Sequence, residues 1–204
     1  MADSTTPSSS ATRWIETSRG ILSYAQLAPL LAERVLRLQE RIEEGEFDTA
    51  RLDEDLLRLL HGEFCGELTP EFAGRWRSIA VRVGTHEPPL PHEVPMKMRD
   101  YALDLAARLD AVSGPEDLPE VLAFAEGRLL SVHPFADFNG RLTRLWLWEL
   151  LRRLGMPPVA LVPEPHDLAA YLAALRAGDA DDYRVLTMLW KERIAHALDS
   201  PPPG

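Results

Sequence analysis

The sequence has a single cysteine, no excess of positive charge and no long apolar run. With Cys65 as the only thiol, an intramolecular disulfide framework and a cysteine-rich zinc site are both excluded. The 32 acidic residues outnumber the 22 basic ones, and the net charge of −10 argues against non-specific binding to nucleic acid or to an anionic membrane. Because no stretch approaches about 18 uninterrupted apolar residues and no signal-peptide pattern opens the chain, we expect a cytoplasmic protein.

The remaining composition is that of one globular domain. The chain has 204 residues, of which 46% are hydrophobic and 26% charged, so it can bury a sizeable core. The Ser/Thr/Pro run at the start and the proline-rich end contain too few apolar residues to order themselves. We therefore expect tails at 1–11 and 199–204.

Apolar residues recur at helical spacing through most of the chain between these tails. The pattern predicts a mainly α fold, and the helix over 140–154 is apolar most of the way round, so we expect it to lie centrally. The predicted helices cover about 29–42, 52–64, 98–109, 118–129, 140–154, 166–177 and 180–198.

One segment is predicted to be a β-strand. Residues 79–83 alternate apolar and other side chains, are rich in β-branched residues and end at Gly84. Three prolines over 85–92 disfavour a helix there. We expect a strand followed by an extended loop, as at the tip and return of a small hairpin.

A compact polar segment lies between two of the predicted apolar helices. Residues 133–144 read His-Pro-Phe-Ala-Asp-Phe-Asn-Gly-Arg-Leu-Thr-Arg. If a helix starts near Asn139 or Gly140, its free N–H groups and its dipole form an anion site. Arg141 and Arg144 then project from one side of the first turn toward the same anion.

Two further side chains of this segment complete a site for a metal-bound phosphate ester. Asp137 suits Mg²⁺, which prefers one or two carboxylates plus phosphate oxygens and water. His133 can accept a proton at neutral pH. The residues indicate phosphoryl or nucleotidyl transfer from a Mg-nucleotide to a hydroxyl, without deciding which phosphorus is attacked. Taken alone, they also fit a plain helix connection in which Asp137 and Asn139 cap the next helix.

The same segment resembles the signature loop of the Fic (AMP-transferase) family, H-P-F-x-[D/E]-G-N-G-R-x-x-R. The resemblance extends over about 50–195 and implies a Fic-type helical bundle with a small β-hairpin, the flap, beside the signature loop. It divides the chain into an N-terminal helical segment at 12–50 and a Fic core at 51–198. The other stretches that look like the family's core, in the family's order, are 59–62, 74–77, 81–84 with its proline-rich sequel, and 171–179.

The resemblance implies a nucleotidyltransferase that moves AMP from Mg-ATP to a Ser, Thr or Tyr hydroxyl of a target protein. By position, His133 is the general base, Asp137 ligates the Mg²⁺ cofactor, and Phe135 anchors the loop in the core. The nucleotide-binding residues are Phe138, Asn139, Gly140, Arg141 for the β-phosphate and Arg144 for the γ-phosphate. The flap, about 80–92, is expected to pin an extended target segment by main-chain pairing, and its central residues are Val83, Gly84, Thr85 and His86.

Phe138 departs from the family pattern, because Gly is common at that position. A side chain there restricts φ and limits how closely the backbone approaches a phosphate. AMP transfer is still favoured, since Gly140 and Arg144 are both retained. The kinase-like branch of the family resembles a loop with Lys in place of that Gly and without the second Arg.

A second family motif, the inhibitory helix [S/T]-x-x-x-E-[G/N], is similar to Thr12-Arg13-Trp14-Ile15-Glu16-Thr17. The resemblance implies that Glu16 pairs with Arg144 and blocks the γ-phosphate, because a carboxylate and a phosphate cannot both take one guanidinium.

Two alternatives stay open at this point. One is a binding module with a retired site, in which Phe138 closes the phosphate pocket and the flap holds a partner peptide. The other is a Fic enzyme that transfers a different nucleotide or phosphate-containing group. The expected partners are a target protein and ATP, with no nucleic acid and no membrane; formation of a homo-oligomer is left open.

Overall fold

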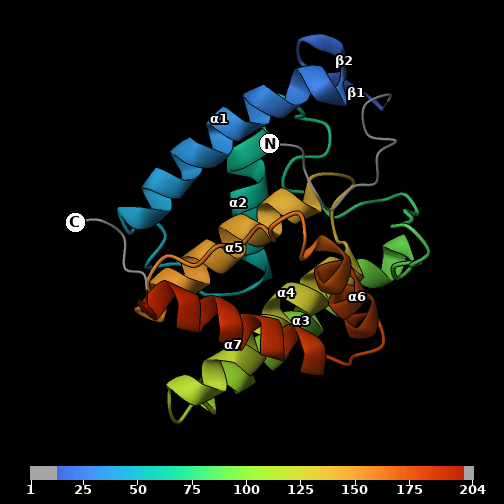
Figure 1. Cartoon of the computed structure of the whole chain (residues 1–204). Helices are drawn as coiled ribbons and strands as arrows, with labels where there is room; N and C mark the ends of the chain where they lie inside the picture. The colour runs from blue at the N-terminus through green and yellow to red at the C-terminus, as the bar shows by residue number, and fades with distance from the viewer. Residues whose placement is uncertain (1–12, 200–204) are drawn as a thin grey trace.

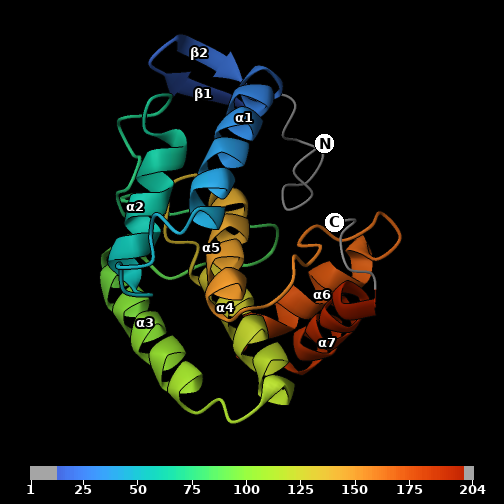
Figure 2. The same cartoon turned by 90° about the vertical axis from the view of Figure 1, so that its left-hand side faces the viewer.

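Two adjacent helices, α4 (Leu118–Val132) and α5 (Asn139–Arg153), form the centre of the fold (Figures 1 and 2). The computed structural model describes residues 13–199, which contain seven α-helices, so the mainly α prediction is confirmed. α1 and α2 pack against α5, whereas α3, α6 and α7 pack against α4. The outer helices are α1 (Tyr24–Glu43), α2 (Glu54–Cys65), α3 (Val94–Asp110), α6 (Leu168–Gly178) and α7 (Arg184–Asp199).

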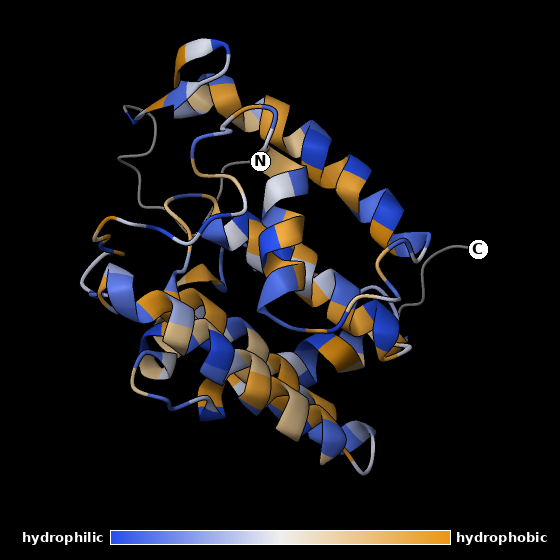
Figure 3. Ribbon diagram, turned by 180° about the vertical axis from the view of Figure 1, so that it is seen from behind, coloured by the Kyte–Doolittle hydropathy of each residue, from blue (hydrophilic) through white to orange (hydrophobic). Residues whose placement is uncertain are grey.

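The central position of α5 follows from its sequence. Trp146, Leu147 and Leu150 are all fully buried, so the helix has apolar contacts on more than one side. α1 is different, because polar and apolar residues alternate around it (Figure 3). Its buried stripe packs on α2 and α5 and leaves the opposite side to solvent. No helix within residues 13–199 has the length and apolar content needed to span a membrane.

The N-terminal part of the described chain is an antiparallel hairpin followed by α1. β1 (Trp14–Thr17) pairs with β2 (Gly20–Ser23), and α1 then begins at Tyr24 with a capping box between Ser23 and Gln26. The predicted start near Pro29 is therefore wrong by more than one turn, because the capping box starts the helix earlier and leaves Pro29 inside it.

The expected inhibitory helix is also wrong in its conformation. Glu16 lies on strand β1 and is exposed, while Thr12 falls outside the described residues. Ile15 and Thr17 alternate with it and are buried, which is the period of two expected for a strand with one buried face. A strand turns Glu16 to the solvent side, so the helical geometry on which its inhibitory role depended is absent.

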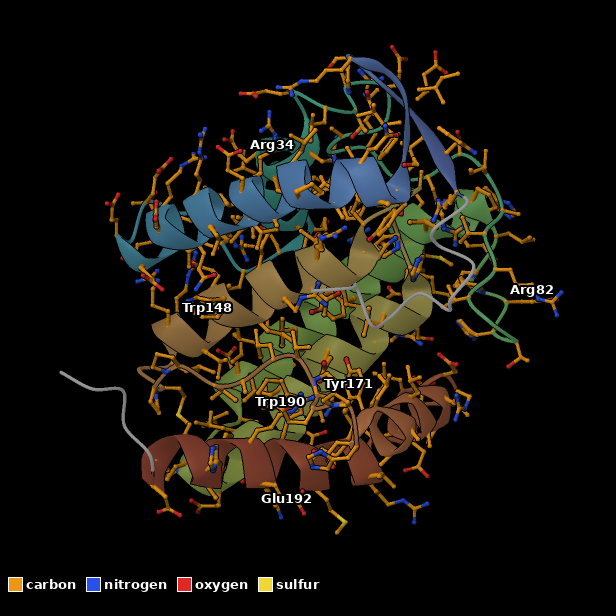
Figure 4. All side chains as sticks on the ribbon, turned by 45° about the horizontal axis from the view of Figure 1, so that its top comes forward. Arg34, Arg82, Trp148, Tyr171, Trp190 and Glu192 are labelled. Carbon is orange, nitrogen blue, oxygen red and sulfur yellow. The ribbon has the colours of Figure 1, made fainter. Side chains whose placement is uncertain are left out.

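The predicted strand over 79–83 does not form either. The flap segment contains one antiparallel residue pair, in which Val83 and His86 exchange both backbone hydrogen bonds at 3.0 and 3.1 Å. Gly84, at φ +60, makes the tight turn between them. Prolines 88, 89 and 91 remove backbone donors from the returning chain, so the pairing cannot extend. Arg82 points outward from this segment (Figure 4).

A buried carboxylate attaches the last two helices to α4. Glu126 of α4 accepts hydrogen bonds from the Tyr171 hydroxyl at 2.7 Å and from Trp190 Nε1 at 2.8 Å, and it pairs with Arg193 at 3.2 Å. Tyr171 and Trp190 lie side by side next to the central helices (Figure 4). The free-energy cost of burying the Glu126 carboxylate is offset because all three donors bind the same carboxylate.

The buried pair Tyr101 and Trp146 gives a test of the core. Tyr101 donates to the Ala125 carbonyl at 3.1 Å and accepts from Trp146 Nε1 at 2.7 Å. Tyr101→Phe leaves the buried indole N–H without its acceptor and should lower the free energy of unfolding by about 1–3 kcal/mol. Denaturant unfolding at neutral pH measures this change.

The matched control is Tyr183→Phe, whose hydroxyl contacts the exposed carboxylate of Asp181. This change should cost no more than about 0.5 kcal/mol. Equal losses for the two variants would contradict the assignment of Tyr101 as an essential buried acceptor.

Candidate active site

His133 is the residue that ends α4. It adopts the left-handed conformation, at φ 49° and ψ 59°, while its backbone N–H still closes the helix on Leu129 at 3.1 Å. The side chain is half-buried, and its Nδ1 lies 3.4 Å from the Leu130 carbonyl. A carbonyl only accepts, so this contact assigns the proton to Nδ1 and leaves the Nε2 lone pair available as a base.

The surroundings of His133 keep the imidazole neutral. Burial lowers its pKa to about 4, and the nearby charged or titratable groups of Arg77, His86 and Arg13 act in the same direction. A neutral imidazole is the form that can take a proton from a hydroxyl at physiological pH. Sequence reasoning had identified His133 but not these three neighbours as its electrostatic partners.

Phe135 fixes the middle of the loop to the core. Its ring is fully buried and stacks on His61 of α2, with 3.9 Å between ring centroids and 7° between ring planes. His61 in turn accepts a hydrogen bond from the Gly74 N–H at 3.0 Å and donates from Nε2 to the Asp137 carbonyl at 3.2 Å. Burial lowers the pKa of His61 to about 4, so the neutral ring satisfies both contacts.

Asn139 shapes the loop with its side chain. Its carboxamide accepts from the Phe135 N–H at 3.0 Å and donates to the Phe135 carbonyl at 2.9 Å, and the residue is 2% exposed. Both ends of the amide are therefore used within the loop. The backbone N–H of Asn139 lies at the start of α5, and the role of Asn139 in nucleotide binding stays a prediction.

Phe138 takes the conformation that glycine would adopt more easily. It is the N-cap residue of α5 at φ 63° and ψ 15°. Its ring is buried against Phe64 and Phe72, at centroid distances of 5.7 and 5.8 Å. The left-handed backbone costs about 1–2 kcal/mol, which is comparable to the gain of about 1.5–3 kcal/mol from burying the ring. The side chain thus lies in the core and does not close the site.

The first turn of α5 offers an anion site. The Phe138 carbonyl accepts from the N–H groups of Arg141 and Leu142, both at 3.0 Å. Within residues 13–199, the backbone N–H groups of Asn139 and Gly140 have no hydrogen-bond partner. These two donors lie at the N-terminus of α5, which is the positive end of the helix dipole, as in anion sites at other helix N-termini.

Asp137 presents its carboxylate next to this turn. Oδ1 accepts from the Phe138 N–H at 2.8 Å, and Oδ2 pairs with the guanidinium of Arg13 at 2.8 Å. Oδ2 of Asp137 therefore already forms an ion pair with a cationic side chain. Among the described residues no group of three or more His, Cys, Asp or Glu side chains could hold a metal, so a bound ion would complete its shell with phosphate oxygens and water. A single carboxylate of this kind fits Mg²⁺ carried by a nucleotide.

Arg141 is held on the side of α5 that faces α1. Its Nη1 donates to the Tyr24 hydroxyl at 2.6 Å, and the guanidinium lies 5.3 Å from the centre of the Tyr24 ring. Arg141 is 6% exposed, whereas Arg144, one turn later, is half-buried. The N-terminal segment thus reaches the site through Arg13 and Tyr24 rather than through Glu16.

One flap residue, His86, also reaches the end of α4. Nε2 of His86 lies 2.8 Å from the Ser131 carbonyl, and its Nδ1 lies 3.3 Å from an oxygen of Asp179, just beyond α6. Val83, Gly84 and Thr85 form the turn that precedes it. The structure therefore brings His133, the α5 N-terminus and the flap segment together.

Comparisons with known proteins agree with this arrangement. The model of the Fic/DOC family matches residues 51–151. A protein adenylyltransferase Fic from Nematostella vectensis is 34% identical over 121 residues, which cover 59% of this chain and 28% of that protein. The chain therefore spans only about a quarter of the length of the curated relatives that it matches.

Solved structures give the same fold. Fic-1 from Caenorhabditis elegans superposes with a TM-score of 0.65 at 27% identity, over 83% of this chain and 48% of that one. The N-terminal FIC domain of Bep8 from Bartonella sp. 1-1C superposes with a TM-score of 0.74 over 88% of this chain and 90% of that one, at 14% identity, and shows the fold alone. From its matched segment, its relatives and its fold, the chain belongs to the Fic/DOC family.

Proposed function

We propose that this chain is a protein adenylyltransferase that transfers AMP from Mg-ATP to a Ser, Thr or Tyr hydroxyl of a target protein. The observation that carries the proposal is the turn between α4 and α5. It places a neutral imidazole at one end and two backbone N–H donors without a partner in residues 13–199 at the other. A base beside an anion site is the arrangement that attack of a hydroxyl on a phosphate requires.

His133 supplies the base in this proposal. Because Nδ1 is engaged by the Leu130 carbonyl, Nε2 is the atom that accepts the proton from the target hydroxyl. The oxygen then bonds to the α-phosphorus, the bond from that phosphorus to the bridging oxygen breaks, and pyrophosphate leaves. AMP remains on the target side chain, and His133 holds the proton until it is released.

In this proposal the first turn of α5 binds the phosphates. The N–H groups of Asn139 and Gly140 face the α- and β-phosphates, and Arg141 and Arg144 add positive charge for the β- and γ-phosphates. Asp137 would hold the Mg²⁺, which when bound neutralises charge on the phosphate oxygens. Asp137 Oδ2 pairs with Arg13, so the metal would have to displace this guanidinium.

The flap segment is the proposed docking site for the target. Its short pair between Val83 and His86 lies near the end of α4, because His86 contacts the Ser131 carbonyl two residues before His133. A target segment lying along it would bring a hydroxyl within reach of the base. A retired binding module is less well supported, because the Phe138 ring packs in the core and leaves the α5 N-terminus open.

The proposal predicts self-modification or target modification that depends on His133. Incubation with ATP and Mg²⁺ should add one AMP mass to the protein or to an added target, and His133→Ala should reduce the rate by at least about 100-fold. Intact mass measurement reports both results. His166→Ala, which removes an exposed histidine, is the matched control and should leave the rate unchanged. Absence of both AMP transfer and Mg-ATP binding in the unmodified protein would favour the binding module.

The pKa of His133 predicts how the transfer rate depends on pH. An imidazole with a pKa of about 4 stays unprotonated down to about pH 5, so kcat/KM should remain nearly constant between pH 7.5 and 5.5. Below that range the base becomes protonated and the rate should fall. Initial rates measured over this range, with circular dichroism to confirm folding, test the expectation. A fall in kcat/KM centred near pH 6.5 would show that burial does not lower the pKa of His133 as described.

Arg13 should compete with the metal for Asp137. Arg13→Ala removes the guanidinium from Oδ2 and should strengthen Mg²⁺-dependent ATP binding by about two- to five-fold, a modest effect because Arg13 is largely exposed. Calorimetric titration at several Mg²⁺ concentrations measures it. Arg19→Ala, in the exposed turn of the same hairpin, is the control for the loss of one positive charge. Weaker or unchanged binding in Arg13→Ala would show that the ion pair does not oppose the metal.

A further inference from the structure

Arg77 is a buried arginine whose guanidinium contacts only backbone carbonyls within the described residues. It is 3% exposed and has no carboxylate partner in residues 13–199. Its Nε donates to the His133 carbonyl at 2.8 Å, and Nη2 approaches the Val132 carbonyl at 3.4 Å. Nη1 donates to the Ile79 carbonyl at 3.1 Å, and Nη2 donates to the Pro89 carbonyl at 2.5 Å.

These acceptors come from two separate parts of the site. Val132 and His133 provide carbonyls at the C-terminal end of α4, where the helix dipole favours a cation. Ile79 and Pro89 lie on either side of the Val83–His86 turn of the flap segment. The Arg77 backbone adds a third attachment, because its N–H donates to the Pro134 carbonyl at 2.9 Å. The Arg77 side chain therefore joins the chain before and after the flap turn to the residue proposed as the base.

The charge of Arg77 is retained in spite of its burial. Burial lowers the pKa of the guanidinium, yet an arginine stays protonated at any physiological pH. Its fork of donors is suited to several carbonyls at fixed angles, which a flexible ammonium group cannot match. The charge of Arg77 also lowers the pKa of the His133 imidazole, as do Arg13 from the N-terminal segment and His86 from the flap.

We propose that Arg77 is a positioning residue that sets the distance between the flap and His133 and so presents the target hydroxyl to the base. This inference rests on the proposed function. The proposed phosphate-binding part of the site lies on the other side of the turn, at Asp137 and the start of α5, and within residues 13–199 it forms no hydrogen bond with Arg77. Loss of the guanidinium should therefore impair transfer while leaving Mg-ATP binding intact.

Arg77→Met is the variant that removes the charge and the donors and keeps the length of the side chain. We expect a folded protein that binds Mg-ATP within about twofold of wild type and transfers AMP about 100-fold more slowly, the loss typical of a small misplacement of reacting groups. Arg77→Lys keeps the charge with fewer donors and should lie between. Arg75→Met, which removes the exposed neighbouring arginine, should behave as wild type.

Two measurements need no turnover and distinguish positioning from simple loss of stability. In Arg77→Met the pKa of His133, followed by NMR, should rise because a repelling charge is gone, whereas in Arg77→Lys it should stay. Amide hydrogen exchange should accelerate over 79–89 and not in α5. If wild type transfers no AMP, the proposed function fails, and these two measurements still decide the role of Arg77.

Several results would overturn the proposal. One is a folded Arg77→Met variant with transfer within threefold of wild type. Another is a His133 pKa and a flap exchange rate that do not change. A third is a loss of Mg-ATP binding as large as the loss of transfer, which would indicate general collapse. If Arg77→Met does not fold, Arg77→Lys decides, because wild-type values of transfer and of flap exchange in that variant contradict the proposal.

Discussion

The site depends on a single constraint: the chain must reverse direction between α4 and α5 within the six residues 133–138, and this reversal must not engage the groups needed for chemistry. The reversal has a left-handed residue at each end, His133 and Phe138. Neither is glycine, so each conformation must be stabilised by its surroundings. The Phe138 ring does this by packing in the core, and His133 is held through its own carbonyl by Arg77. The turn is thereby kept rigid while Nε2 of His133 and two N–H groups stay available.

Buried polar groups organise the rest of the molecule around this turn. The Asn139 carboxamide closes the loop on Phe135, and His61 connects the same loop to α2. Glu126 attaches α6 and α7 to α4, the helix that presents His133. Each of these groups has its hydrogen-bond partners, and no buried side-chain N or O atom in the described chain lacks one. The core therefore serves to fix the end of α4 relative to the start of α5.

The helical architecture could be predicted from the sequence because it depends on local patterns. Apolar spacing located all seven helices of the described chain, and the signature segment identified His133, Asp137 and the start of α5. What the sequence did not show depends on contacts between distant residues. The pairing of β1 with β2 replaced a predicted helix around Glu16, because the burial of Ile15 and Thr17 on one face of the strand depends on the tertiary fold. The roles of Arg77 and Tyr24 were missed for the same reason, since their partners lie 56 and 117 positions away.

The most direct test of the account is to ask which phosphate reaches the target. Wild-type protein would be incubated with Mg²⁺ and with ATP labelled either at the α-phosphate or at the γ-phosphate, and the label retained on protein after denaturing wash would be counted. The account predicts retention of the α-label alone, lost in His133→Ala, because attack occurs at the α-phosphorus and pyrophosphate leaves. Retention of the γ-label would contradict it, since it would mean that a phosphate rather than AMP is transferred.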